Sequence, residues 1–390
     1  MNENPKRVPL DALVEFLVDD ILQESDDAIL EEFAEADGDP EEFARQMRGK
    51  VDDLVLLKNK HRLAAARLKM VFAAIENDTA ARGSAEGHEP NQQTSAPQFS
   101  LAARNGRFVD EGVHAALRET LARLVKADVA KDRVTIRASV PAVALLKYLG
   151  VSEPNEIDLD AIAFAAGAEI ERRHLKGCDA QIVGYGERAI ILVDSRHSDE
   201  RQRFSIAHEL GHWLLHRGRD LSCSAHEAPS EKRQYFESEA DHFAAELLMP
   251  RYLFLKYAER LRTASQLTAA IRLSEVFSTS ITSTAIRLLD MDRSPSILVC
   301  HGHSGRKWFH RAPSAPTQWR PLSELSAETD AFSVLFGRKP NTSPRRVPAR
   351  AWFDSHIAKD YFVKEQTMRI DSDQVLTMIT PEEPMLRAAV

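Results

Sequence analysis

Apolar residues recur at helical spacing in the first part of the chain. Residues 10–22 and 51–75 each place leucine, valine and alanine on one stripe of a helix, with charged residues between them. The turn signal Asp37-Gly38-Asp39-Pro40 separates the two runs, and proline suits the first position of a helix. We therefore expect a helical N-terminal region over residues 1–76.

The helical pattern disappears after residue 76. Residues 77–98 are rich in Gly, Ser, Pro, Asn and Gln and hold hardly an apolar side chain larger than alanine. Such a composition cannot bury a core and is typical of a flexible connection. We expect a linker over residues 77–106.

Helical and strand-like patterns alternate from residue 107 to residue 250, so the fold class is expected to be α+β. The amphipathic and β-branched runs predict helices at 113–125, 141–150 and 157–167, and strands at 168–175, 180–183 and 189–193, with a turn at Gly184–Gly186. Residues 251–291 are expected to be a helical segment. Residues 292–390 are expected to be a small C-terminal domain of mixed helices and strands.

Charge and cysteine content indicate which partners and which cellular compartment to expect. The net charge of −8 argues against a polyanion-binding chain as a whole, although a local basic face stays possible. The segment from Asp11 to Glu42 is dense in acidic residues; it is either a solvated helical face or a docking surface for a basic partner. Three widely spaced cysteines form no disulfide framework. With neither a signal peptide nor a long apolar run, we expect a soluble, cytoplasmic protein without membrane contact.

The run RFSIAHELGHWLLH at residues 203–216 carries the strongest chemical signal. His208 and His212 are four residues apart, so on a helix their rings share one face and can bind one zinc ion. Glu209 sits beside that metal without ligating it and can act as general base on a water molecule. Ser198 or Asp199 is expected to cap this helix.

A second amphipathic helix, YFESEADHFAAELLMP at residues 235–250, supplies candidates for a third ligand, since a catalytic zinc usually takes three protein ligands. Glu237 and Asp241 share a face. Glu237 can reach the metal, while Asp241 can accept a hydrogen bond from the second ring nitrogen of a ligating histidine. Glu239, which points to another side of the helix, is the rival ligand, and Glu246 is a weaker one.

Together these runs resemble the ImmA/IrrE family of metallopeptidases. After an HELGH helix, the family motif has the form E-x-x-A-[N/D]-x-F-A-x-x-L-L-M-P, and this chain carries ESEADHFAAELLMP from Glu237 to Pro250. The resemblance covers about residues 140–290. It implies a zincin-like core with one Zn²⁺ per chain, held by His208, His212 and Glu237, and the pairing of Glu237 with Asp241 is similar to that of thermolysin-like gluzincins.

The resemblance also implies a function. Several family members cut or inactivate helix-turn-helix transcriptional repressors, so we expect a zinc endopeptidase of narrow specificity whose partner is a protein substrate, a repressor of the XRE type or a similar regulatory protein. The alternative is a non-catalytic zinc-fold protein that controls such a partner, a repressor or an antitoxin, by binding alone.

Other residues near the motifs are open candidates. A peptidase needs a group that stabilises the oxyanion, and the residues close enough in sequence are His216, His226, Tyr235 and His242. A thiolate of Cys178 or Cys223 could instead occupy the open zinc position, although a free cysteine is usually a small buried apolar residue. The strand at Ala189–Val193 is either a core strand or an edge to which an extended peptide adds.

Two further segments allow more than one interpretation. Residues 273–289 resemble a helix-turn-helix, with a turn at Ser278–Ser280. Only Arg272 and Arg287 are basic nearby, which favours a structural or substrate-docking role and leaves direct DNA binding open. In the second segment, Cys300, His301, His303 and His310 lie close in sequence, but their spacing is not that of a known zinc module.

Overall fold

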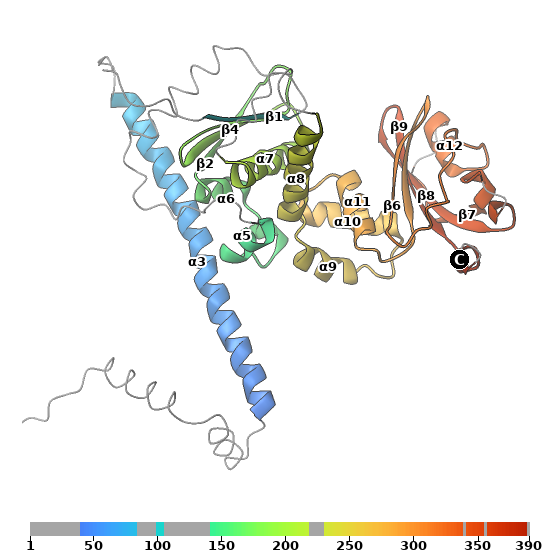
Figure 1. Cartoon of the computed structure of the whole chain (residues 1–390), viewed down its shortest axis with the longest axis horizontal. Helices are drawn as coiled ribbons and strands as arrows, with labels where there is room; N and C mark the ends of the chain where they lie inside the picture. Colours follow the sequence, from blue (N-terminus) through green and yellow to red (C-terminus); the bar gives the residue numbers. More distant parts are fainter. Residues whose placement is uncertain are drawn as a thin grey trace, which may run out of the picture. The chain divides into compact units, whose positions relative to one another are not determined.

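The computed structural model describes residues 40–83, 99–104, 141–217, 230–337, 341–354 and 357–387, and they form the expected α+β fold. The chain divides into two compact units, residues 1–59 and residues 60–390. The second unit contains both β-sheets and the helices between them (Figure 1). Within the described residues, no helix combines the length and the apolar character that crossing a membrane requires.

The long helix α3, Pro40–Gly83, begins at the proline expected to open a helix. Most of the predicted helix at 10–22 and most of the acidic segment from Asp11 to Glu42 lie outside the described residues. Because α3 continues to Gly83, the first residues of the predicted linker are helical. Several large apolar side chains of α3 stay exposed, among them those of Met47, Val51 and Leu54.

Residues 60–67 of α3 belong to the second unit and contact the rest of it through ion pairs. Lys60 Nζ lies 2.9 Å from Glu156 Oε1, and Arg67 Nε lies 2.8 Å from Asp158 Oδ2. Between them, Leu63 is buried among the core residues of the unit. This part of α3 is therefore fixed to residues 156–158.

A four-stranded sheet in the order β1-β3-β4-β2 forms the first layer of the second unit. β2 and β4 are parallel, and the other pairs are antiparallel. Its strands are β1 Phe99–Arg104, β2 Ala168–Arg173, β3 Ala180–Tyr185 and β4 Arg188–Asp194.

Two sequence expectations about this sheet need correction. β3 continues through Gly184 and Tyr185, so the turn is made by Gly186 and Glu187 instead, with Gly186 at φ 58°. β4, the strand considered as an edge for peptide addition, is paired on both sides, by β3 and by β2. Since both of its hydrogen-bonding edges are used, a further strand cannot add to it.

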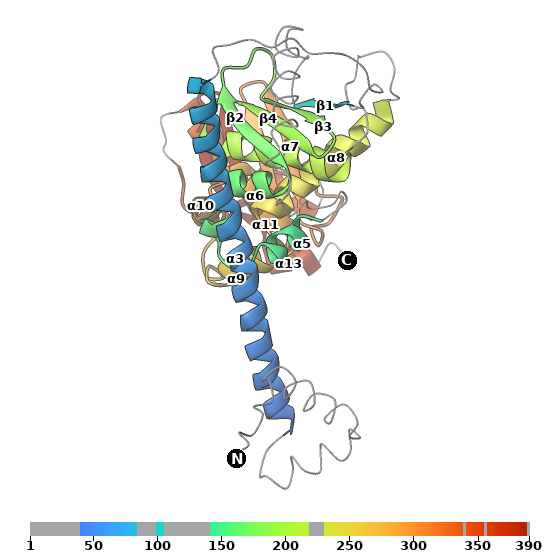
Figure 2. The same cartoon turned by 90° about the vertical axis from the view of Figure 1, so that its left-hand side faces the viewer.

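Helices cover one face of this sheet (Figures 1 and 2). α7 contacts β1, β3 and β4, and α6 contacts β2. Between α3 and α8, the described helices are α5 Ala142–Tyr148, the 3-10 turn η2 Pro154–Glu156, α6 Leu159–Ala165 and α7 Asp199–Leu215. Ser198 is the N-cap residue of α7, as the sequence suggested, but its side chain makes no capping hydrogen bond.

Two glycines allow α7 to pack closely on both sides. A Cβ at Gly184 of β3 would lie 2.4 Å from the Trp213 ring, so this glycine makes room for the indole, which donates to the Ala166 carbonyl at 2.8 Å. A Cβ at Gly211 would lie 3.2 Å from the Ala240 Cα and 3.2 Å from the Phe243 Cβ. α7 and α8 therefore approach each other more closely at Gly211 than most side chains permit.

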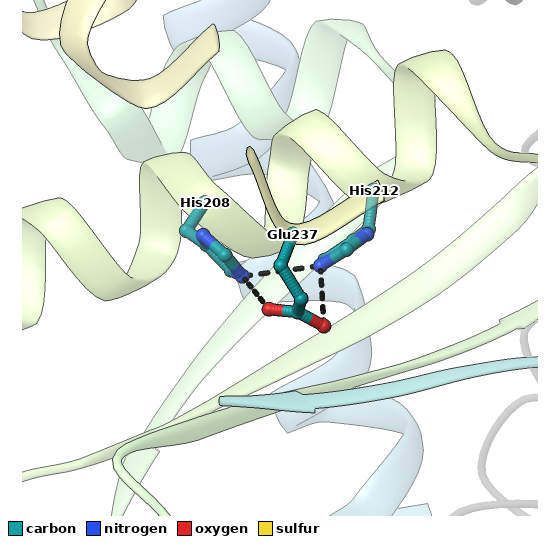
Figure 3. A group of neighbouring side chains, drawn as sticks. All are labelled: His208, His212 and Glu237. Carbon is teal, nitrogen blue, oxygen red and sulfur yellow. Dashed lines mark hydrogen bonds and ion pairs between the residues drawn. The ribbon is translucent and has the colours of Figure 1, made fainter. Parts of the chain in front are cut away.

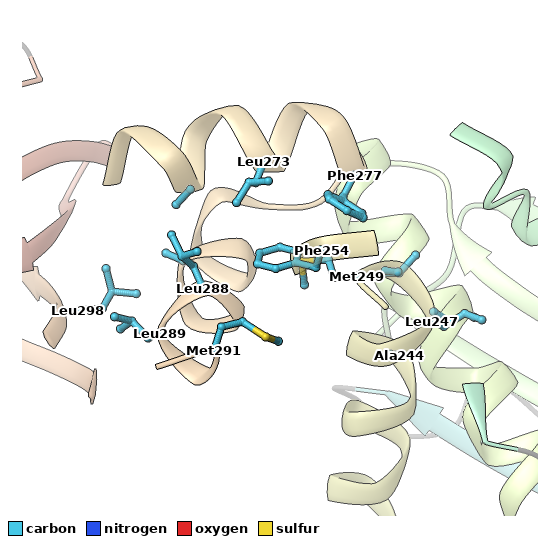
Figure 4. Packing of buried hydrophobic residues seen from close by; sticks show 14 of the residues in the cluster. Ala244, Leu247, Met249, Phe254, Leu273, Phe277, Leu288, Leu289, Met291 and Leu298 are labelled. Atoms are coloured by element: carbon cyan, nitrogen blue, oxygen red, sulfur yellow. The ribbon is translucent and has the colours of Figure 1, made fainter. Parts of the chain in front are cut away.

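Helices after α7 link the first sheet to the second through a continuous apolar core (Figure 4). Phe254, Phe277, Leu273 and Leu288 belong to this core, and the ring centroids of Phe254 and Phe277 lie 5.4 Å apart. α8 ends just before Met249 and Pro250, as the proline predicts. The helices are α8 Ser230–Leu248, α9 Arg251–Glu259, α10 Gln266–Phe277 and α11 Ile281–Asp290.

The C-terminal part of the unit is a five-stranded antiparallel sheet in the order β6-β5-β9-β8-β7. α10 and α11 contact it through β9, β5 and β6, and α12 contacts β8 and β9. Its elements are β5 Ile297–Gly302, β6 Gly305–Arg311, α12 Asp330–Phe336, β7 Arg345–Pro348, η3 Ala349–Ala351, η4 Ile357–Lys359, β8 Phe362–Asp371, β9 Gln374–Pro381 and α13 Glu383–Arg387.

Candidate metal centre

Three side chains from two helices converge on one point (Figure 3). His208 and His212 come from successive turns of α7, and Glu237 comes from α8, which crosses α7 near Gly211. The Nε2 atoms of the two histidines are 3.0 Å apart. The Glu237 oxygens lie 3.3 Å from His208 Nε2 and 3.7 Å from His212 Nε2.

These separations suit a tetrahedral zinc ion. Ligands at about 2.0–2.1 Å from zinc are about 3.3 Å apart in tetrahedral geometry, which is the middle of the observed range. Two imidazole nitrogens and one carboxylate are also a typical zinc donor set. The residues present therefore fit the metal that the sequence motif implies.

The ionisation of the site favours metal binding. Burial lowers the pKa of His212 against the raising effect of Glu237, which keeps the ring neutral and its lone pair available. For Glu237, burial acts to raise the pKa, but hydrogen bonds from His208 and His212 outweigh it and hold the pKa well below its ordinary range. Glu237 is therefore a carboxylate, and its charge suits a cation.

A carboxylate orients the first histidine. His208 Nδ1 lies 2.9 Å from Asp241 Oδ1, one helical turn after Glu237 on α8. Because a carboxylate can only accept, His208 donates from Nδ1 and carries its lone pair on Nε2, toward His212 and Glu237. This is the contact expected of Asp241 from the sequence, and its importance for metal binding stays a prediction.

The second histidine is supported by a chain of polar groups that the sequence did not predict as such. His212 Nδ1 lies 3.1 Å from His216 Nδ1, and His216 Nε2 lies 3.1 Å from Glu239 Oε2. The Tyr235 hydroxyl donates to the other Glu239 oxygen at 2.8 Å. The spacing of four residues between His212 and His216, and between Tyr235 and Glu239, is the signal that could have suggested two pairs on facing helices.

These contacts show where several of the alternative site residues lie. Glu239, the rival third ligand, contacts His216 and not the Nε2 atoms of the cluster. His216 lies on the Nδ1 side of His212, away from the point where the ligand atoms meet, and Tyr235 is joined to Glu239 behind it. His216 and Tyr235 thus belong to the polar groups behind His212, and the identity of the oxyanion-stabilising group stays a prediction. His242 is exposed, and His226 lies outside the described residues.

Glu209 is fully buried on α7 between the two histidine positions. It is close enough to Cys178 to influence that thiol: burial first, and the Glu209 charge second, raise the pKa of Cys178 to about 11. Cys178 does not belong to the three-residue cluster. The idea of a Cys178 thiolate on the metal finds no support, and Cys223 lies outside the described residues.

The remaining residues considered as metal ligands do not meet. His301 faces the Leu322 carbonyl at 3.3 Å, His310 contacts Asp290 at 2.7 Å, and the His303 ring packs on Phe336. Among the described residues, the only group of three or more possible ligands is His208, His212 and Glu237. Glu246, the weaker rival ligand, is bound to Arg287 at 2.6 Å.

The segment that resembles a helix-turn-helix consists of α10 and α11, joined at Ser278, which has φ 51°, through Thr279 to the cap residue Ser280. One of its two arginines is buried and hydrogen-bonded inside the protein. Arg287 is buried, pairs with Glu246 and donates twice to the Met249 carbonyl, at 3.1 and 2.9 Å. Arg287 is therefore not available to a DNA phosphate.

Comparisons with known proteins agree with the motif. A peptidase family model described as the IrrE N-terminal-like domain matches residues 164–289. The radiation response metalloprotease IrrE of Deinococcus radiodurans is 29% identical over 234 residues, which cover 56% of this chain and 67% of the relative. A transcriptional regulator of Mycobacterium tuberculosis covers 63% of this chain and 88% of its own, with 16% identity and a TM-score of 0.43, a likeness too distant to indicate a shared function.

The family model spans the three ligand positions, Glu209 and Asp241, and it ends within α11. It begins in α6 and so leaves out α3 and β1. The match of residues 164–289 and the similarity to IrrE both support membership of this domain in the ImmA/IrrE family of metallopeptidases.

Proposed function

We propose that this chain is a zinc-dependent endopeptidase of narrow specificity that cleaves a regulatory protein, a helix-turn-helix repressor of the XRE type being the favoured substrate. The observation that supports it most is the convergence of His208, His212 and Glu237 beside a fully buried Glu209. A purely structural zinc site has no use for a carboxylate at position 209. The family supports a peptidase, and the relative in Deinococcus radiodurans is a metalloprotease of the radiation response.

In the proposed mechanism, the chain's own side chains divide the work. Zinc, when bound, supplies Lewis-acid activation of water and of the scissile carbonyl. Glu209 takes a proton from the attacking water and passes it to the leaving amine. Asp241 holds the His208 ring by its Nδ1–H, and His216 with Glu239 holds the His212 ring. The packed helices thus fix the rings before substrate arrives.

We further propose that α10 and α11 dock the substrate and do not read DNA. Arg287 is turned into the core, and Arg272 is the other arginine of this segment. A cavity of about 490 Å³ opens between the start of α7 and the start of α11, with Phe204 and Ile286 in its wall. The other lining residues are polar, and the acidic groups of Asp179 and Glu200 disfavour a phosphate, so a protein partner suits this cavity better. In this proposal the zincin-like domain at 107–250 cuts, and the segment at 251–291 helps to position the protein to be cut.

The test is a Glu209→Gln variant, which keeps the size and the hydrogen-bonding capacity of the side chain. We expect it to bind zinc like the wild type and to lose cleavage of a co-expressed repressor. Retained cleavage would refute the role of Glu209. A variant without cleavage that still relieves repression in cells would favour the alternative function, control of the partner by binding alone.

A further inference from the structure

The strand β1 occupies the edge of the sheet beside the candidate metal centre. Phe99–Arg104 pairs antiparallel with β3 over its whole length, from Phe99 opposite Tyr185 to Arg104 opposite Ala180. β1 also contacts α7, the helix that carries His208 and His212. In Figure 3, β1 is the teal strand that passes the cluster on the side to which the Glu237 carboxylate points.

The register places alternate positions of β1 on the α7 side of the sheet. Gly184 faces Trp213 of α7, so the positions paired with Gly184 and, two residues on, with Ile182 lie on that side. These positions are Ser100 and Ala102. A peptide backbone that runs past the metal ligands in this way is placed as an extended substrate would be.

β1 is not part of the family domain. The matched segment begins at residue 164 and contains β2, β3 and β4, in which β3 is an outer strand. β1 comes to that edge from the predicted linker, 60 residues and more before the match begins. Its sequence, FSLAAR, has no β-branched residue, and Phe99 is its one residue of high strand preference. Its place in the sheet therefore depends on the open edge of β3.

We propose that β3 is the edge along which this peptidase binds an extended peptide, and that the chain's own segment Phe99–Arg104 fills that edge. The inference rests on the proposed function and adds a form of control to it. A protein substrate must displace the segment before its backbone can pair with β3. Because the segment belongs to the same chain as β3, it competes with a free peptide as a tethered ligand.

Direct binding of the segment's own sequence tests the proposal. The probe is a fluorescein-labelled peptide of residues 97–106, PQFSLAARNG, measured by fluorescence anisotropy. Every protein is the full chain in a Glu209→Gln background, so that no probe is cut. In one variant, residues 99–104 are replaced by Gly-Ser-Gly-Ser-Gly-Ser. The matched control carries the same replacement at residues 84–89, in the linker before β1.

A second variant guards against misfolding of the first. Leu101→Pro with Ala102→Pro removes two consecutive backbone donors, one of which must point toward β3 in an antiparallel pair. Zinc content is measured on every protein and reports whether the metal centre is intact.

We expect both β1 variants to bind the probe at least about tenfold more tightly than the unaltered chain and the control, because a tethered competitor reduces the fraction of open sites. Equal binding by all four proteins would overturn the proposal. So would loss of zinc or of probe binding in both β1 variants, since β1 would then be a structural strand of the domain. Neither readout requires cleavage, so an inactive wild type would refute the peptidase and leave this result standing.

Discussion

Removal of the carboxylate at Asp241 tests how the chain tunes its metal site. Asp241 Oδ1 accepts from His208 Nδ1 at 2.9 Å and fixes the ring with its Nε2 lone pair toward Glu237. Loss of such a support typically costs about 10- to 100-fold in metal affinity. The Asp241 side chain is 56% exposed, so water can replace part of the bond. We therefore expect the lower end, about tenfold, or about 1.4 kcal/mol.

The assay is zinc competition against a chromophoric chelator at pH 7. Asp241→Ala is expected to weaken zinc about tenfold, and Asp241→Asn less, since an amide oxygen still accepts from Nδ1 but without a full charge. Glu275→Ala is the matched control, because it removes an exposed carboxylate far along the chain, on α10. Zinc affinities of the wild type and Asp241→Ala within twofold of each other would refute the idea that this contact orients His208.

Three further predictions follow from the packing. Gly211→Ala places a methyl group 3.2 Å from the Ala240 Cα, so it should push α7 and α8 apart. We expect a loss of about 1–3 kcal/mol in the free energy of unfolding, measured in denaturant, and a lower zinc affinity. Unchanged stability and zinc affinity would contradict this prediction. Arg287→Ala should lower the free energy of unfolding by about 3 kcal/mol, because it leaves Glu246 without the arginine and the Met249 carbonyl without its donors. The double variant Arg287→Met with Glu246→Gln should recover much of this loss. Equal unfolding midpoints for the wild type and Arg287→Ala would contradict the prediction. Burial lowers the pKa of His301 from 6.5 to about 4. Between pH 6.5 and pH 4, the unfolded chain therefore binds a proton at His301 that the folded chain does not. The free energy of unfolding should fall by about 2 kcal/mol from pH 7 to pH 5. In His301→Gln that part of the acid sensitivity should vanish from thermal unfolding curves, and an unchanged pH dependence would refute it.

Local sequence patterns were enough to predict many of the helices and strands. The spacing of His208 and His212 placed both rings on one helical face, and Pro250 marked the end of α8, because these are effects within one element. The strands β3 and β4 follow from β-branched runs and a glycine turn in the same way. The turn between them begins two residues later than predicted, at Gly186, because Gly184 packs against Trp213 and is not part of the turn.

Relations between elements were harder to derive. Glu237 and Glu239 differ only in the side of α8 on which they lie, and the residues alone left both open until the family resemblance was considered. The rotation of α8 depends on its close approach to α7 at Gly211, a tertiary contact. The same holds for β1, whose six residues lack a strand pattern and gain their place from the open edge of β3.

The most direct test of the central claim is the metal content of the purified chain and of Glu237→Ala, by elemental analysis after dialysis, with Ser238→Ala as the control on the neighbouring, exposed position of α8. We predict about one zinc per chain in the wild type and the control, in keeping with a site of three protein ligands, and loss or clear weakening in Glu237→Ala. A wild type without zinc, or a Glu237→Ala protein that holds zinc as firmly as the control, would contradict the proposed metal centre.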